Sequence, residues 1–126
     1  MANISEFMAS ELVTVDPHTT VADAAAIMGQ KGVGSTLVME SERLLGIFTE
    51  RDLVRAVSQH SYAPRHLVSD YMTPDPTTIQ PGATAEQAMD MMLSRGFRHL
   101  PVEEQGKVVG IISMRDLSRI LQKPGE

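Results

Sequence analysis

The sequence of 126 residues contains one internal repeat with a constant spacing. Residues 46–53 (Gly-Ile-Phe-Thr-Glu-Arg-Asp-Leu) align with residues 110–117 (Gly-Ile-Ile-Ser-Met-Arg-Asp-Leu), so that Asp116 lies 64 residues after Asp52. The same shift, held without a gap, also pairs Met8 with Met72, Pro17 with Pro81, Thr20 with Thr84, Met28 with Met92, and Gly32 with Gly96. Two copies are too few for a solenoid. We therefore expect two repeats, residues 1–62 and 63–126, packed around a pseudo-two-fold axis.

Each repeat has the pattern of a strand, a helix, two strands and a second helix. In the first repeat, β-branched residues predict a strand at 13–15, and Thr20 with Asp23 forms a typical helix N-terminal pair. Apolar residues at helical spacing follow, and Gly32 is placed to end the helix in the left-handed conformation. Strands are predicted at 36–39 and 44–48, and the second helix begins at Thr49. The same signals recur 64 residues later, which predicts an α/β fold of two β-α-β-β-α repeats.

The bulk composition excludes several classes of function. A net charge of −5 does not suit binding to a nucleic-acid backbone, which depends on clustered Lys and Arg. The sequence has no apolar run of about 20 residues and no signal-like start, so we expect no membrane partner and a cytoplasmic location. It contains no cysteine, which removes disulfides, thiolate nucleophiles and Cys-based zinc sites.

The residues with the most chemical potential lie where the third strand of each repeat becomes a helix. Thr49 and Asp52, like Ser113 and Asp116, place a hydroxyl and a carboxylate three residues apart. Such pairs are ordinary helix caps, worth roughly 1 kcal/mol without any ligand. The same groups also suit a ribonucleotide, because a helix N-terminus and a hydroxyl attract phosphate while a carboxylate accepts ribose hydroxyls. The motif alone leaves both interpretations open.

The pattern as a whole resembles a tandem pair of cystathionine-β-synthase-type (CBS) domains, also called a Bateman module. The resemblance rests on the two Gly-Ile-x-Thr/Ser-x-x-Asp-Leu motifs, on residues 98–102 (Arg-His-Leu-Pro-Val), on the openings 15–17 and 79–81, and on Met8 and Met72. It covers almost the whole chain. It implies a regulatory module that binds an adenine nucleotide (AMP, ADP, ATP or a related adenosyl compound) in the cleft between the repeats.

The resemblance also implies roles for individual residues. Asp52 and Asp116 would bind ribose, and Thr49 and Ser113 would bind phosphate. For one site it assigns Ser113, Arg115, Asp116, Arg98 and His99, with Thr14, Val15, Val33 and Gly34 contributed by repeat 1. For the other it assigns Thr49, Arg51 and Asp52, with Thr78, Ile79 and Phe97 contributed by repeat 2. No metal ligand is expected, and Mg²⁺ would enter only together with ATP.

The two sites are not expected to be equal. Arg98 and His99 align with Gly34 and Ser35, so the first repeat lacks two potential phosphate partners. We therefore predict that the Asp116 site is the stronger one and that the Asp52 site is weaker or empty.

The resemblance implies a homodimer that passes a conformational change to an effector protein. The alternative is a structural or protein-interaction module without a physiological nucleotide, which the capping interpretation favours. We do not expect an enzyme, because the sequence lacks a nucleophile elbow, an HExxH motif and a phosphate-binding P-loop.

Overall fold

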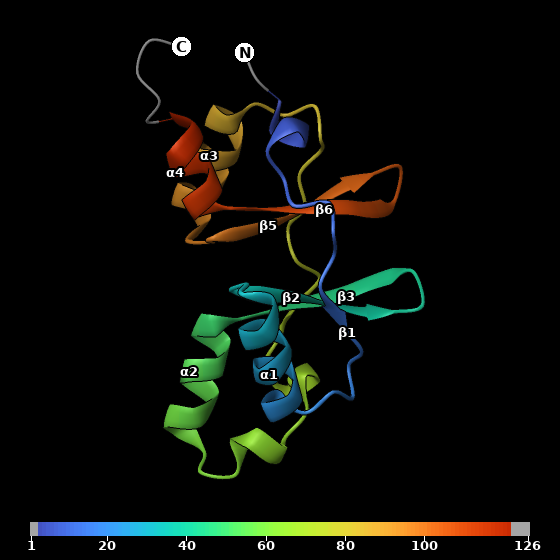
Figure 1. Ribbon diagram of the computed structural model, residues 1–126, viewed down its shortest axis with the longest axis vertical. Coiled ribbons are helices and arrows are strands. Elements are labelled where there is room, and N and C mark those ends of the chain that lie inside the picture. The colour runs from blue at the N-terminus through green and yellow to red at the C-terminus, as the bar shows by residue number, and fades with distance from the viewer. Residues whose placement is uncertain (1–2, 122–126) are drawn as a thin grey trace. The chain divides into compact units, whose positions relative to one another are not determined.

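The computed structural model describes residues 3–121, which form two compact units (Figure 1). The continuous unit comprises residues 13–76, and the split unit combines the N-terminal segment up to Leu12 with the chain from Thr77 onward. These units do not coincide with the sequence ranges 1–62 and 63–126, whose outer ends, residues 1–2 and 122–126, lie outside the described residues. The N-terminal segment thus packs in the unit that carries the second repeat.

The continuous unit contains a four-stranded sheet in the order β1-β2-β3-β4. Its elements along the chain are β1 (Thr14–Val15), α1 (Val21–Lys31), β2 (Ser35–Glu40), β3 (Arg43–Thr49), α2 (Glu50–Gln59), the 3₁₀ turns η2 (Ala63–Arg65) and η3 (Val68–Asp70), and β4 (Thr73–Pro74). Strand β1 runs parallel to β2, whereas β2–β3 and β3–β4 are antiparallel.

The split unit repeats this arrangement with shorter sheet edges. Its elements are η1 (Ile4–Glu6), α3 (Ala85–Arg95), β5 (His99–Glu104), β6 (Lys107–Ser113) and α4 (Met114–Leu121). A single parallel bridge joins Ile79 to Val102, and a single antiparallel bridge joins Ala9 to Ile111. These two bridges occupy the places of β1 and β4, so both units present the same strand order.

The predicted α/β class and element order are confirmed, and the ends of the helices follow the expected chemistry. The Thr20 hydroxyl accepts the Asp23 amide at 3.1 Å. Gly32 and Gly96 end α1 and α3 with φ of 67° and 76°, a left-handed conformation that glycine adopts without steric cost. Strands β2 and β3 are each two residues longer than the predicted ranges 36–39 and 44–48, because hydrogen bonding continues past the apolar residues at both ends.

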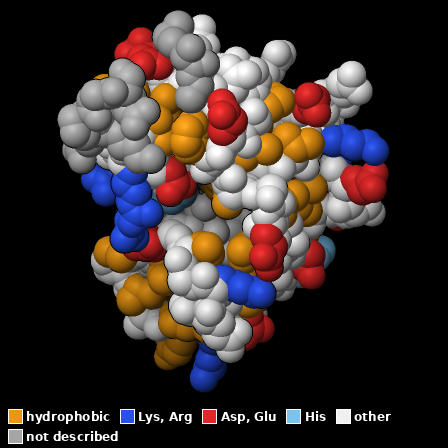
Figure 2. Space-filling view, turned by 45° about the horizontal axis from the view of Figure 1, so that its top comes forward, with side chains coloured by type: hydrophobic (Ala, Val, Ile, Leu, Met, Phe, Trp, Pro, Cys, Tyr) orange, Lys and Arg blue, Asp and Glu red, His pale blue; other side chains and the backbone are white. Residues whose placement is uncertain are grey.

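The surface of the described residues is mixed in charge. On the face drawn in Figure 2, Lys and Arg side chains are interspersed with Asp and Glu side chains. No helix among residues 3–121 has the length and apolar character needed to cross a membrane.

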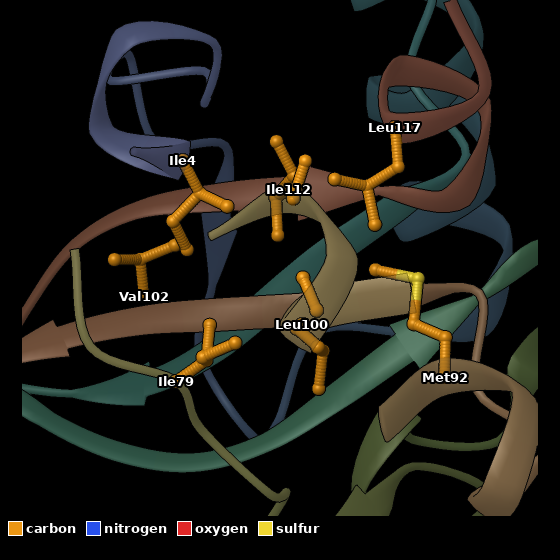
Figure 3. Close-up of a cluster of buried hydrophobic side chains, with 9 residues drawn as sticks. Ile4, Ile79, Met92, Leu100, Val102, Ile112 and Leu117 are labelled. Atoms are coloured by element: carbon orange, nitrogen blue, oxygen red, sulfur yellow. The ribbon is translucent and has the colours of Figure 1, made fainter. Parts of the chain in front are cut away.

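Each unit has its own hydrophobic core. In the split unit the buried cluster consists of Ile4, Ile79, Ala85, Ala88, Met92, Leu100, Val102, Ile112 and Leu117 (Figure 3). In the continuous unit it consists of Val15, Val21, Ala24, Met28, Val38, Phe48 and Val68. Ile4 comes from the N-terminal segment and is fully buried in the split-unit core. Burying such a side chain stabilises a fold by about 1.5–3 kcal/mol, so this segment is a structural part of the split unit.

A methionine over a glycine fixes each edge segment against its sheet. A Cβ atom on Gly110 would lie 2.5 Å from Met8 Sδ and 3.0 Å from the Ala9 carbonyl oxygen. A Cβ atom on Gly46 would likewise lie 2.5 Å from Met72 Sδ. Both glycines therefore allow a close approach that no larger residue permits, which explains why Met8 and Met72 align with one another in the repeat.

Candidate functional site

The start of α2 in the continuous unit is a closed capping box. The Thr49 amide and the Thr49 hydroxyl both donate to Asp52 Oδ2 at 3.0 Å, and the Asp52 amide donates to Thr49 Oγ1 at 3.3 Å. The second carboxylate oxygen, Oδ1, accepts Arg55 Nη2 at 3.0 Å. Asp52 is only 4% exposed. Both oxygens of this buried carboxylate are therefore used by the protein itself.

The start of α4 in the split unit has the same plan with fewer bonds. The Ser113 hydroxyl donates to Asp116 Oδ2 at 2.8 Å, and the Asp116 amide donates to Ser113 Oγ at 3.1 Å. Within residues 3–121, Asp116 Oδ1 accepts no hydrogen bond and forms no ion pair. Asp116 is also half-buried rather than buried. The capping interpretation is thus confirmed for both motifs, while the split unit leaves one acceptor oxygen available.

In each unit the first strand of the hairpin, β5 or β2, begins beside the start of the helix that follows the hairpin. The Met114 amide donates to the Arg98 carbonyl at 2.8 Å, and His99 is the register partner of Ser113. The backbone of Arg98 and His99 therefore lies beside the start of α4, and a shared binding role for these residues stays a prediction. In the continuous unit the Glu50 amide donates in the same way to the Gly34 carbonyl at 3.0 Å.

In the first strand of each repeat, around Val15 and Ile79, the aliphatic side chains are buried and the backbone is the part left to contact a ligand. The side chains of Val15 and Ile79 are each 7% exposed and belong to the cores of their own units. Thr14 is exposed and Thr78 is half-buried. A ligand could therefore be contacted at these positions through peptide groups and threonine side chains, and not through the two aliphatic side chains.

The remaining predicted residues divide into surface cations and packing residues. Arg51, Arg98 and Arg115 are exposed, whereas Val33 and Phe97 pack against the edges of the cores. Within residues 3–121 no group of His, Asp and Glu side chains has the arrangement of a metal site. Each predicted site combines residues of both units, and this combination stays a prediction.

Sequence reasoning missed Arg55 as part of the motif. It lies three residues after Asp52, on the same face of α2, which is the spacing at which opposite charges meet on a helix. That spacing was the available signal. The same signal at Arg119 and Asp116 does not produce an ion pair within the described residues, so the pattern alone does not distinguish the two cases.

Comparison with known proteins identifies the repeated unit. The family model for the CBS domain matches residues 4–59 and again residues 68–123. An uncharacterized 17.7 kDa protein of Acidianus ambivalens is 39% identical over 120 residues, which cover 94% of this chain and 72% of that protein.

Solved structures agree in fold. The CBS-domain containing protein ATU1752 from Agrobacterium tumefaciens superposes with a TM-score of 0.91 at 34% identity, covering 95% of this chain and 99% of that one. CBSX2, solved in complex with AMP, superposes with a TM-score of 0.81 at 28% identity, covering 96% of each chain. With a repeated motif, a repeated unit and a family match to each half, this chain belongs to the CBS-domain family and carries a tandem pair of CBS domains.

Proposed function

We propose that this protein is a regulatory module that binds an adenine nucleotide or a related adenosyl compound, with its principal site at Asp116. The observation that supports the proposal most directly is that Asp116 Oδ1, at the start of α4 beside Ser113, Arg98 and His99, has no partner among residues 3–121. The solved relative CBSX2 is in complex with AMP, which supports the same class of ligand.

The chemistry of the site suits a nucleoside phosphate better than a free phosphate. A ribose diol donates hydrogen bonds, and a carboxylate with one open oxygen can accept them. Ser113 and the amides at the start of α4 can bind phosphate, and the exposed guanidinium groups of Arg98 and Arg115 offset its charge. Inorganic phosphate alone would be repelled by Asp116.

The proposed output is a change of conformation passed to a partner protein. In this proposal the ligand contacts both repeats, including Thr14, Val15, Val33 and Gly34, and the protein acts as a homodimer. A ligand shifts a conformational equilibrium only to the extent that it binds one state more tightly. Light scattering and chemical cross-linking with and without AMP would therefore measure both the oligomeric state and its response to ligand.

A thermal-shift screen of adenine nucleotides, followed by calorimetry on each hit, tests the proposal. Ligand at about 100 times Kd adds about 2.7 kcal/mol of stability, enough to raise Tm by several degrees. Asp116→Asn keeps an oxygen to accept the Ser113 hydroxyl but loses the charge that a diol would use. We expect at least about a tenfold loss of AMP affinity, since a hydrogen bond to a charged group contributes about 1.5–3 kcal/mol.

Asp52→Asn is the matched control, because it makes the same change at the equivalent position of the other repeat. We expect it to leave the AMP affinity within about twofold of the parent, a spread of about 0.4 kcal/mol. Equal losses in both variants would contradict the ranking of the two sites. Release of phosphate or adenine during the titration would contradict binding without turnover.

A second function has one specific observation in its favour. Both hydroxyl–carboxylate pairs are closed onto their own helix starts, as a purely structural cap requires. A structural or protein-interaction module would show no thermal shift with any nucleotide at millimolar concentration.

A further inference from the structure

The carboxylates of Asp52 and Asp116 differ in the hydrogen bonds that they accept from the protein. Asp52 Oδ2 accepts two bonds from Thr49, and Oδ1 accepts one from Arg55, so both oxygens already have a partner within the protein. The side chain of Asp52 is 6% exposed, while that of Arg55 is 51% exposed. The guanidinium group therefore bridges the buried carboxylate and solvent.

We infer that Arg55 closes the first-repeat site by serving as the permanent internal partner of Asp52, so that each chain binds one nucleotide rather than two. This inference rests on the proposed function, because it concerns the second site of the same module. A ribose diol carries no charge and would have to displace a charge-assisted hydrogen bond, which is roughly twice as strong as a neutral one. The exchange is unfavourable for the ligand.

Arg55 is held in this position by a second anchor. Its Nη2 also donates to the Tyr71 carbonyl at 3.2 Å, which ties α2 to the segment after η3. The Tyr71 ring is stacked on His66 at an interplanar angle of 8°, and its hydroxyl lies 2.7 Å from His66 Nδ1. The carbonyl that receives Arg55 therefore belongs to a segment fixed by its own side-chain contacts.

The split unit provides a natural comparison at the equivalent positions. Arg119 lies three residues after Asp116, as Arg55 does after Asp52. Arg119 is nevertheless exposed and, in the described part of the chain, pairs with neither Asp116 nor another carboxylate. The residue aligned with Tyr71 is Phe7, which has no hydroxyl for a bond like that to His66. Arg55 thus pairs with the aspartate of its motif, whereas Arg119, at the equivalent position of the other repeat, does not pair with Asp116 among the described residues.

Calorimetric titration with AMP tests the inference through the number of sites. The parent is expected to bind one equivalent per chain. Arg55→Gln removes the positive partner and opens Asp52 Oδ1, the oxygen that has no partner at Asp116 among the described residues, so we expect a second equivalent. Arg119→Gln is the matched control and is expected to keep one equivalent, because no ion pair is lost.

A double variant assigns the new equivalent to its site. Asp116→Asn alone is expected to bind AMP at least about tenfold more weakly than the parent, and adding Arg55→Gln is expected to restore one equivalent at Asp52. Arg55→Met is made in parallel, since it keeps the aliphatic stem of the side chain that packs beside Asp52. Thermal melting without ligand compares Arg55→Gln with Arg55→Met. The variant whose Tm stays nearer to that of the parent is the one that is titrated.

The outcomes separate this inference from the proposed function. One equivalent in the parent and no gain after removal of Arg55 overturns the inference and leaves the proposed function standing. Two equivalents in the parent also overturn it. No AMP binding by the parent contradicts the proposed function, and the inferred count of one nucleotide per chain is then wrong as well.

Discussion

The continuous and split units are copies of one repeat, yet each is completed by the leading segment of the other repeat. The continuous unit gains its edge strand β4 from the chain that follows α2. The split unit gains the equivalent bridge, Ala9 to Ile111, from the segment that precedes β1. The residues of that bridge lie about 100 positions apart in the sequence, so forming the split unit closes a much longer loop. The entropic cost of closing a loop rises only with the logarithm of loop length, so the longer loop destabilises the split unit only slightly.

The comparison teaches that a repeat of sequence and a unit of structure need not share their boundaries. The pairing of Met8 with Gly110 and of Met72 with Gly46 keeps the two edges equivalent, although the connections differ. Whether the two units are equally robust depends on whether the N-terminal segment holds its edge as firmly as the segment at 68–74 holds its own.

The largest expected effect comes from weakening the N-terminal segment at Ile4. Ile4→Ala removes a fully buried side chain from the split-unit core, which typically costs 2–5 kcal/mol. The Ile111 amide, which donates to the Ala9 carbonyl at 3.0 Å, should lose protection from hydrogen exchange. Chemical denaturation measures the free energy of unfolding, and hydrogen exchange shows which of the two units is destabilised.

Val68→Ala is the matched control, because Val68 occupies the equivalent buried position in the continuous unit. We expect a smaller cost, since truncation to alanine removes one carbon atom fewer from valine than from isoleucine. We expect the loss of protection at the Asp75 amide, which donates to the Leu45 carbonyl. If Ile4→Ala instead exposed the Asp75 amide and spared Ile111, the assignment of the N-terminal segment to the split unit would be wrong.

A second, smaller effect is expected from closing the gap over Gly110. Gly110→Ala places a methyl group against Met8 Sδ and the Ala9 carbonyl, and only the methionine can move without breaking the edge pairing. Overpacking of this kind costs typically 1–3 kcal/mol. The midpoint of urea unfolding measures the change, and adding Met8→Ala should recover part of it.

Gly82→Ala serves as the control for the glycine change itself. No atom lies within 4 Å of a Cβ at this position, and its φ is not in the left-handed region. The substitution should therefore be neutral or should stabilise by up to about 1 kcal/mol through the unfolded state. A cost at Gly82 equal to that at Gly110 would show that contact with Met8 is not the cause.

Much of the fold was predictable because the repeat supplied every local signal twice. Capping pairs, left-handed glycines and alternating apolar residues are short-range patterns, and each was found in both halves. The swap of the N-terminal segment was not predictable, because no local pattern states which of two equivalent sheets an edge segment joins. Met8 aligns with Met72 in sequence, but this alignment does not indicate whether Met8 packs on Gly46 or on Gly110.

The capping of the two helix starts was predictable from residue types, because the hydroxyl and the carboxylate stand three residues apart in both motifs. His99 lies opposite Ser113 because the hairpin fixes the strand register, and the binding role of these residues stays a prediction. The occupation of Asp52 by Arg55 could not be read from spacing, since Arg119 has the same spacing and no ion pair within the described residues. The difference depends on the Tyr71 carbonyl, which only the tertiary structure places.

The smallest of these effects concerns a position where the two cores differ in polarity. Thr36 is fully buried on β2, opposite Phe48, and its hydroxyl has no hydrogen-bond partner in the described part of the chain. The split unit has Leu100 opposite Ile112 at these places. Thr36→Val replaces the hydroxyl by a methyl group of similar size, so we expect a gain of about 1 kcal/mol, seen as a higher urea midpoint with an unchanged slope. Thr36→Leu copies the split unit but adds volume beside the larger Phe48, and it should lose stability. A gain from leucine and none from valine would mean that the core of the continuous unit has unfilled space and that its hydroxyl carries no penalty.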